Sequence, residues 1–466
     1  MQKWFLSGIF LGVIWLAVGC IIPPIRPTTE TGQPIKGAAG LGDKLFPNAG
    51  NGGYDVQHYD LDLTVDIKSN TITSTATLTA LATSTLDTFN LDFHELTIDG
   101  LTVNGVETPY QREEDELVID PRLPLAQNAL FTVTVHYHGQ PKLIKDSGWL
   151  NYYDRVGVEN GALGAATWYP VNNTRLDKAT YSFRVKVPPA YMALANGQLL
   201  GEESDASGWT TYRWATESPM ASANATLMID RYVLQSSATS PSGVLLHTYT
   251  GPYVQERTLA LFDQTPAMLA LLEELVGPYP FANYGVLIHT ESSPYITFPQ
   301  ELAIFSQSGL SYYGAEAVMN GLAFQYFGNS VSTAQSQDRW LIQGLGGYLG
   351  WLWIEKSQGP AALQTLIHRN QTTFHLDSPL VVTTAQELDS DSIYFRSPLA
   401  IYALRLRLGD ERFFQLLRTF YVRYRGSNAG TEDFIALAEE VSGEDLTAFF
   451  QAWLYDDKLP PLPSTE

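Results

Sequence analysis

The fold of this chain is decided by two short stretches, Asn320-Gly321-Leu322-Ala323-Phe324-Gln325-Tyr326-Phe327-Gly328-Asn329 and Trp340-Leu341-Ile342-Gln343-Gly344. Asn320 and Phe324 stand four residues apart, so a helix through the first stretch places them on one face. Gln343 follows Phe324 by nineteen residues. Neither stretch contains a histidine, cysteine, aspartate or glutamate. The side chains that most often bind a transition metal or activate water are therefore missing from both.

Both stretches resemble the active-site segments of a family of zinc aminopeptidases, the gluzincins related to membrane alanyl aminopeptidase. The family pattern is His-Glu-Leu-Ala-His-Gln-Trp-Phe-Gly-Asn, followed by Trp-Leu-Asn-Glu-Gly. The resemblance places the three zinc-ligand positions at Asn320, Phe324 and Gln343, and the general-base position at Gly321. The pattern keeps its spacing and these flanking residues: Gln325, Phe327-Gly328-Asn329, Trp340-Leu341 and Gly344. It implies a short bacterial member of this family with a degenerate zinc site.

The residues at these positions do not suit a catalytic zinc ion. Phe324 has no lone pair, and Gly321 has no side chain. Asn320 and Gln343 offer neutral amide oxygens, which suit calcium or magnesium in larger oxygen cages. All eight histidines of the chain lie outside the two stretches, so a relocated zinc site is not expected. We therefore expect no bound metal, no other cofactor and no functional catalytic residue, although the resemblance implies zinc.

A substrate-binding strand of the family resembles residues 296–300, Ile-Thr-Phe-Pro-Gln. The resemblance places Thr297 where the family has the glutamate that binds the free α-amine of a peptide. The substrate-cleft candidates on this segment are Thr297, Phe298, Pro299, Gln300 and Glu301. A strand would place Glu301 on the same face as Thr297 but about 13 Å away. We expect Glu301 to be a solvated glutamate, and a replacement amine anchor is the alternative.

Residues 393–396, Ile-Tyr-Phe-Arg, resemble the segment that carries the transition-state tyrosine of the family. This places that role on Tyr394, and Arg396 becomes a further substrate-cleft candidate. Without a metal-bound oxyanion to stabilise, Tyr394 has no catalytic task. We expect it to be a packing residue whose hydroxyl group is hydrogen-bonded.

Aromatic residues and glycines are concentrated around the two stretches. Four glycines within seven residues weaken the second helix, so tight backbone packing must compensate if it forms: Gly344, Gly346, Gly347 and Gly350. The aromatic residues are Phe324, Tyr326, Phe327, Trp340, Tyr348, Trp351 and Trp353. We expect them to fill the space that zinc and water would occupy. An aromatic-lined pocket for a peptide end or a sugar is the alternative.

The first twenty residues are typical of a bacterial lipoprotein signal. One basic residue, Lys3, precedes an apolar run from Trp4 to Val18, which is short for a membrane span. Cys20 follows Leu-Ala-Val-Gly, which resembles the lipobox whose cysteine is lipidated. Cys20 is the only cysteine, so an internal disulfide is excluded. We expect a lipid on Cys20 to hold the protein at the outer face of a bacterial membrane, and a plain secretory signal is the alternative.

The chain changes character along its length, and this predicts an α+β protein with five segments. Residues 1–20 are the signal peptide and 21–52 form a flexible Pro/Gly/Thr-rich tether. Alternating apolar and polar runs over 53–242 predict an antiparallel β-sandwich or saddle domain. Helical spacing dominates 243–455, and the resemblance makes this a thermolysin-like domain. Residues 456–466 form an extended tail.

Composition excludes some classes of partner. The chain has 466 residues and a net charge of −21, so phosphate backbones repel it and a nucleic-acid partner is not expected. The remaining hypotheses are a catalytically inactive homologue with a binding or scaffold role in the former peptide cleft, for which a peptide is a possible ligand, an active aminopeptidase with a non-standard metal such as calcium, and a structural cell-surface protein. We favour the first, because both histidines, the base and the third ligand are missing together. Sequence leaves the oligomeric state open.

Overall fold

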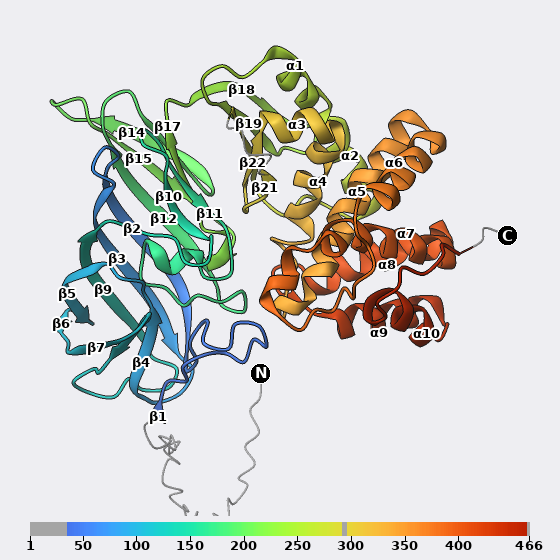
Figure 1. The fold of residues 1–466 in the computed structure, drawn as a ribbon. Coiled ribbons are helices and arrows are strands. Elements are labelled where there is room, and N and C mark those ends of the chain that lie inside the picture. Colours follow the sequence, from blue (N-terminus) through green and yellow to red (C-terminus); the bar gives the residue numbers. More distant parts are fainter. Residues whose placement is uncertain (1–34, 291–295, 464–466) are drawn as a thin grey trace, which may run out of the picture.

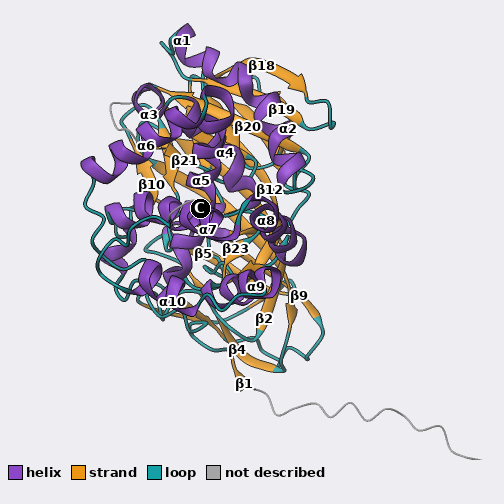
Figure 2. Cartoon of the chain, turned by 90° about the vertical axis from the view of Figure 1, so that its right-hand side faces the viewer, coloured by secondary structure: helices purple, strands orange, loops and turns teal. Residues whose placement is uncertain are grey.

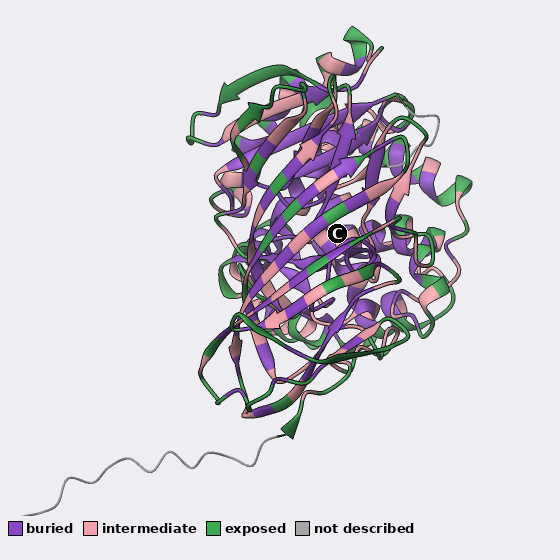
Figure 3. Ribbon diagram, turned by 90° about the vertical axis from the view of Figure 1, so that its left-hand side faces the viewer, coloured by how far each residue is buried: buried purple, intermediate pink, exposed green. Residues whose placement is uncertain are grey.

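The largest sheet is built on long strands that alternate between buried and exposed residues. The computed structural model describes residues 35–290 and 296–463. In β2 (Tyr54–Asp66), Tyr59, Leu61 and Leu63 are buried, and the residues between them face outward. Figure 3 shows this alternation along neighbouring strands. It follows from the two-residue repeat of a strand, which sends successive side chains to opposite faces.

Nine strands form this sheet, in the order β14-β15-β12-β2-β3-β9-β5-β6, with β16 paired to β12. The strands beside β2 are β3 (Thr71–Ala82), β5 (Thr97–Val103), β6 (Val106–Glu107), β9 (Leu130–Gly139), β12 (Lys178–Val187), β14 (Gln198–Ser204), β15 (Thr210–Ala215) and β16 (Met220–Ala221). The sequence predicts an antiparallel arrangement, but β2 and β12 run parallel. Because several strands lie between them in the chain, β12 is free to return in either direction.

Two four-stranded sheets complete the β-rich half. The first has the order β1-β4-β8-β7 and contains β1 (Ile35–Lys36), β4 (Leu86–Asp92), β7 (Tyr110–Glu113) and β8 (Glu116–Ile119). The second has the order β10-β11-β17-β13 and contains β10 (Gly148–Asn151), β11 (Val156–Glu159), β13 (Met192–Ala195) and β17 (Leu227–Asp230). All three sheets contribute to one apolar core, for example through Phe89, Trp149 and Phe183.

The second half combines a five-stranded sheet with helices (Figures 1 and 2). The sheet has the order β18-β19-β20-β22-β21 and contains β18 (Val233–Thr239), β19 (Leu245–Thr250), β20 (Asn283–His289), β21 (Ile296–Thr297) and β22 (Leu302–Ser306). The domain boundary predicted at 242/243 falls inside the β18–β19 hairpin. The sheet of the second half begins with β18 at Val233, about ten residues before that boundary. The predicted α+β class, with the β-rich part first, is confirmed.

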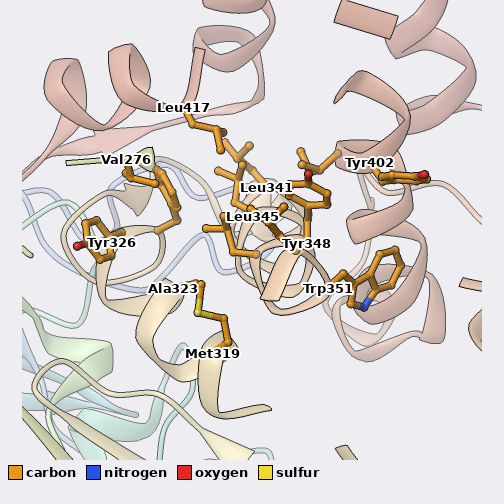
Figure 4. Close-up of a cluster of buried hydrophobic side chains, with 14 of the residues drawn as sticks. Val276, Met319, Ala323, Tyr326, Leu341, Leu345, Tyr348, Trp351, Tyr402 and Leu417 are labelled. Atoms are coloured by element: carbon orange, nitrogen blue, oxygen red, sulfur yellow. The ribbon is translucent and has the colours of Figure 1, made fainter. Parts of the chain in front are cut away.

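Ten α-helices are described in this half. They are α1 (Glu256–Leu259), α2 (Thr265–Leu275), α3 (Gln307–Tyr313), α4 (Ala315–Tyr326), α5 (Arg339–Gln358), α6 (Pro360–Thr373), α7 (Ser397–Leu408), α8 (Asp410–Tyr424), α9 (Thr431–Ser442) and α10 (Thr447–Phe450). A short pair, β23 (Ser332–Thr333) and β24 (Asn428–Ala429), links the loop after α4 to the loop before α9. Side chains of α4, α5, α7 and α8 meet in one buried cluster (Figure 4). This cluster fixes how the two helices with the sequence stretches lie together.

The segment 35–52 is folded against both halves of the molecule. Asp43 accepts the N–H groups of Leu45 and Phe46, and its second oxygen accepts that of Ser336 in the helical half. Leu45 and Phe46 pack on the helical core, whereas Asn51 is buried in the β-rich half. The prediction of a flexible tether is therefore wrong for residues 35–52. Hydrogen bonds between side chains and distant backbone hold this segment, and such bonds leave no apolar period in the sequence.

The C-terminal tail is bound to the body of the protein, which the sequence does not predict. The tail from residue 456 is extended, but Lys458 forms an ion pair with Asp377 at 2.8 Å, and Leu459 and Leu462 pack on the helical core. The signal segment 1–20 with Cys20, and residues 21–34, lie outside the described residues. Among the helices that are described, none has the length and apolar character needed to cross a bilayer.

One lysine joins the two halves. Lys178, at the start of β12, donates from Nζ to the carbonyl oxygens of Asn329, Ser330 and Ser427, at 3.2, 2.9 and 3.0 Å. Burial lowers the pKa of Lys178 to about 8, so the ammonium is still mostly protonated at pH 7. Three N–H groups therefore meet three carbonyls, which satisfies a buried cation completely.

Candidate functional site

Helices α4 and α5 pack side by side and carry the positions singled out in the sequence. Asn320 and Phe324 lie one turn apart on α4, and Gln343 lies in the second turn of α5. All three side chains are half-buried. Asn320 Oδ1 is buried and has no hydrogen-bond partner. The three positions thus remain arranged around the contact between the two helices.

The ring of Phe324 fills the contact between α4 and α5. A Cβ atom added at Gly346 would lie 2.4 Å from Cε2 of this ring and 2.8 Å from Asn320 Oδ1. A Cβ atom at Gly328 would lie 2.9 Å from the other edge of the ring. Phe298 stands against the same ring, with the centroids 5.1 Å apart. Part of the Phe324 ring therefore packs against aromatic and backbone atoms while the side chain as a whole is half-buried, and its role in filling the former metal space stays a prediction.

The general-base position is closed in the same way. A Cβ atom added at Gly321 would lie 2.8 Å from Phe305, 2.9 Å from the hydroxyl oxygen of Tyr284 and 3.1 Å from Phe298. Real Cβ atoms do not approach other atoms below about 3 Å, so a glutamate at position 321 would require its neighbours to move. The hydroxyl of Tyr284 is buried and has no partner. Aromatic side chains occupy the space that a base would need.

Each of the four glycines of α5 that were singled out in the sequence lies close to atoms of a neighbouring element, as tight packing requires. Gly344 faces Ser397 and Ile401, Gly347 faces Pro398, and Gly350 faces the backbone of Glu316. Of the other aromatic residues, Tyr326, Phe327, Trp340, Tyr348 and Trp351 are fully buried in the core, and Trp353 packs at its edge. Close packing of α5 against its neighbours compensates for the low helix propensity of its glycines.

The chemistry at these positions does not fit a zinc ion. Zinc in a three-ligand peptidase site needs imidazole nitrogens or carboxylates, and it leaves one position for water. The structure instead offers a phenyl ring and two neutral amides at these three positions. Among the described residues, no group of three or more histidine, cysteine, aspartate or glutamate side chains could hold a metal ion.

Residues 296–301 lie against α4 but turn away from a straight strand. Thr297 ends β21, where it pairs with Ile304 of β22, and Phe298 points at α4. Gln300 is fully buried and donates from Nε2 to the carbonyl of Ser218. Gln325 of α4 accepts the N–H of Glu301 and donates to the carbonyl of Pro299. Gln325 of α4 therefore holds this loop in place.

Glu301 is not solvated, contrary to our expectation. Its side chain is 3% exposed, and residues 298–301 form a turn after β21 in which Glu301 has a φ of 62°, so the step from Thr297 does not run along one strand face. One carboxyl oxygen of Glu301 has no hydrogen-bond partner. Burial raises the pKa of Glu301 to about 8. The side chain is therefore protonated at neutral pH and lacks the charge that an amine anchor needs.

Tyr394 and Arg396 lie on a π-helical turn, Ser392–Arg396, before α7. The hydroxyl of Tyr394 accepts from Arg339 at 2.7 Å and donates to Asp389 at 3.0 Å. The side chain is 37% exposed, so it is hydrogen-bonded as expected but is not a core residue.

Arg396 is a structural residue, and its prediction as a cleft residue is wrong. It is 0% exposed and donates to the carbonyls of Leu376, Ser378, Ala452, Asp456 and Asp457. The π turn directs its side chain to the C-terminal segment, and a short sequence motif does not reveal this.

Comparison with known families agrees with this architecture. The family model of the peptidase M1 N-terminal domain matches residues 55–223. The family model of the peptidase family M1 domain matches residues 311–453. The chain belongs to the M1 peptidase family. The resemblance to zinc aminopeptidases in the sequence is therefore confirmed.

Several relatives of this M1-family chain are known. It is 24% identical to leukotriene A-4 hydrolase of Xenopus laevis, over 88% of this chain and 72% of that protein. It is 23% identical to glutamyl aminopeptidase of Sus scrofa, of which it spans 46%. A crystallised M1 zinc metallopeptidase of Deinococcus radiodurans is 25% identical, with a TM-score of 0.84, covering 91% of this chain and 99% of that one. The fold of this chain thus follows that metallopeptidase over nearly its whole length.

The Phe324–Gly346 contact predicts a stability change that depends on both residues. Replacing Gly346 with alanine should lower the free energy of unfolding by about 1 kcal/mol, because overpacking costs about 1–3 kcal/mol and helix propensity returns about 1. In a Phe324→Ala background the same substitution should stabilise the protein, since the ring is gone. Urea unfolding of the four proteins measures this coupling. Equal effects of Gly346→Ala in both backgrounds would show that the ring does not limit the helix contact.

Glu301 predicts a pH-dependent stability. Its folded pKa of about 8 lies above the ordinary value of 4.5, so its contribution is fully present below pH 4.5 and is lost as pH rises through 8. The loss is at most about 1.4 kcal/mol per pH unit. Glu301→Gln should therefore become more stable relative to the wild type between pH 5 and 8, measured by urea unfolding.

Other buried carboxyl groups also contribute to the pH dependence of the wild type, so only the difference between the two proteins reports on Glu301. Burial raises the pKa of Asp92 and Asp177 to about 7. The exposed Glu440, which pairs with Arg423, provides the control variant Glu440→Gln. Parallel pH profiles of the wild type and Glu301→Gln would contradict the assignment.

Proposed function

We propose that this M1-family protein does not hydrolyse peptide bonds and acts by binding. The observation that carries the proposal is the aromatic filling around Phe324 and Gly321. In a metallopeptidase, a metal ion and a base activate water next to the scissile carbonyl. Here the ring of Phe324 and the neighbours of Gly321 occupy that volume, and the hydroxyl of Tyr394 is held between Arg339 and Asp389.

A peptide or an amino acid is the ligand class that we propose. Support comes from structural neighbours of 26% identity. A mutant of the Deinococcus radiodurans M1 zinc metallopeptidase was crystallised with the substrate Tyr-Ser-Ala, and a mutant two-domain M1 zinc metallopeptidase with L-tryptophan or L-arginine. Because the former metal site is filled in this chain, the ligand would bind beside it rather than across it.

An active aminopeptidase with a non-standard metal is the second candidate. The relatives named aminopeptidases favour it, as does Asn320 Oδ1, a buried oxygen without a partner. An oxygen ligand of this kind suits calcium better than zinc. However, calcium takes six to eight oxygens, and Gln343 is the one other amide at these positions.

The two candidates predict opposite outcomes in one assay. We expect purified protein to bind far less than one zinc ion per chain and to release no arylamine from aminoacyl-arylamides, with or without added zinc or calcium. The Deinococcus radiodurans metallopeptidase serves as the active control. Stoichiometric metal, together with turnover that a chelator abolishes, would overturn the inactive assignment.

We further propose that a lipid on Cys20 anchors the protein at the outer face of a bacterial membrane. The support is the sequence Leu16-Ala17-Val18-Gly19-Cys20 after the apolar run. Cys20→Ser should move the protein from the membrane fraction to the soluble fraction of a bacterial host, as measured by fractionation and palmitate labelling. Unchanged membrane association without label would refute the anchor.

A further inference from the structure

A small cavity lies where three parts of the chain meet, which we call the junction cavity. It has a volume of about 40 Å³, room for about three water molecules. The N-terminal segment contributes Asp43 and Phe46, the loop before β12 contributes Asn173 and Arg175, and Thr333 and Ser336 come from the helical half. The cavity therefore joins the β-rich half, the helical half and the segment that spans them.

Two buried polar side chains of this cavity have no hydrogen-bond partner. Both amide atoms of Asn173 are unpaired, although the residue is only 2% exposed. The hydroxyl of Thr333 is also unpaired, and this residue is 1% exposed. A buried polar group without a partner costs about 1–3 kcal/mol. An amide and a hydroxyl left open toward one cavity indicate that a polar ligand completes them.

The loop that carries Asn173 is held rigidly by its backbone. Asp92 accepts the N–H of Asn173 at 2.9 Å, and Asn172 pairs with Asn51 of the N-terminal segment. The side chain of Ser222 binds the carbonyls of Asn172 and Thr174. Several backbone groups of the loop are thus hydrogen-bonded, while the side chain of Asn173 is not. Such an arrangement presents a donor and an acceptor in a fixed position.

Arg175 adds a positive charge to the cavity. Among the described residues, no carboxylate forms an ion pair with its guanidinium group within 4.0 Å. Burial and the nearby Arg339 lower the pKa of Arg175 to about 10, so it stays charged at neutral pH. Arg339 already pairs with Asp389, and Asp43 is occupied by three backbone N–H groups. Asp43 lines the same cavity and attracts the charge of Arg175 without forming an ion pair with it.

We propose that the junction cavity binds a carboxylate group, which accepts hydrogen bonds from Arg175 and from Nδ2 of Asn173. The planar guanidinium group matches a carboxylate in geometry and charge. Oδ1 of Asn173 and the hydroxyl of Thr333 then face the atoms next to the carboxylate, where a peptide or amino acid carries an N–H group. The carboxylate could belong to a free acid or to the C-terminus of a peptide. If the carboxylate is the C-terminus of a peptide, the inference rests on the proposed function. If it belongs to a free acid, the inference is independent of that function.

Titration of the full-length protein with N-acetylglycine, followed by calorimetry, tests this proposal. N-acetylglycinamide is the matched neutral ligand and should bind at least tenfold more weakly. A tripeptide that binds more tightly than N-acetylglycine would identify the ligand as a peptide C-terminus. Acetate that binds as tightly as N-acetylglycine would identify it as a small acid. Equal binding of the amide, or of sulfate and phosphate, would mean an adventitious ion only and would overturn the proposal.

Two substitutions separate binding from folding. Arg175→Met should weaken N-acetylglycine at least tenfold and should leave the melting temperature unchanged or higher, because it removes a desolvated cation next to Arg339. Thr333→Val keeps the shape of the side chain and should weaken binding several-fold. Arg184→Met, at an exposed ion pair with Asp62, is the control and should bind normally. Normal binding by Arg175→Met would refute the site, whatever the outcome of the peptidase assay.

Discussion

The contact between the ring of Phe324 and Gly346 is the constraint on which the helical half depends. It sets how closely α4 and α5 approach, and it brings Phe298 and the loop after β21 against α4. In a metalloprotein, ion binding contributes to folding and makes stability depend on metal supply. Here the ring of Phe324 packs between the two helices, and apolar packing of this kind does not depend on a bound ion.

The polar residues that flank this contact connect it to the rest of the molecule. Gln325 holds the loop 299–301, and Asn329 accepts from Asn224 of the β-rich half and donates to the carbonyl of Phe298. Lys178 binds the carbonyls just beyond α4. These residues keep their place in the sequence pattern because they join elements, and this role is independent of catalysis. The chain can therefore retain the frame of a peptidase after its ligand residues are gone.

Local patterns predicted the parts of the structure that depend on local repeats. The two-residue alternation around Tyr59 and the helical spacing after Ser397 specify which face is buried, and both appear where expected. Glu301, Arg396 and the segment 35–52 were misjudged because their positions depend on a positive φ, a π turn and hydrogen bonds to distant backbone. Arg175 and Thr333 gave no signal, since only the folded chain brings them to one cavity.

The docking of residues 35–52 also determines how the body would stand on a membrane. The described chain begins at β1, on one edge of the β-rich half (Figure 1). With a lipid on Cys20, the residues up to Ile35 reach at most about 50 Å even when fully extended. The β-rich half would then be the part nearest the bilayer, and the helical half would project outward from a single attachment point. The length of chain between Cys20 and Ile35 would limit the distance of the folded body from the lipid surface. The body would still be free to tilt about its attachment point.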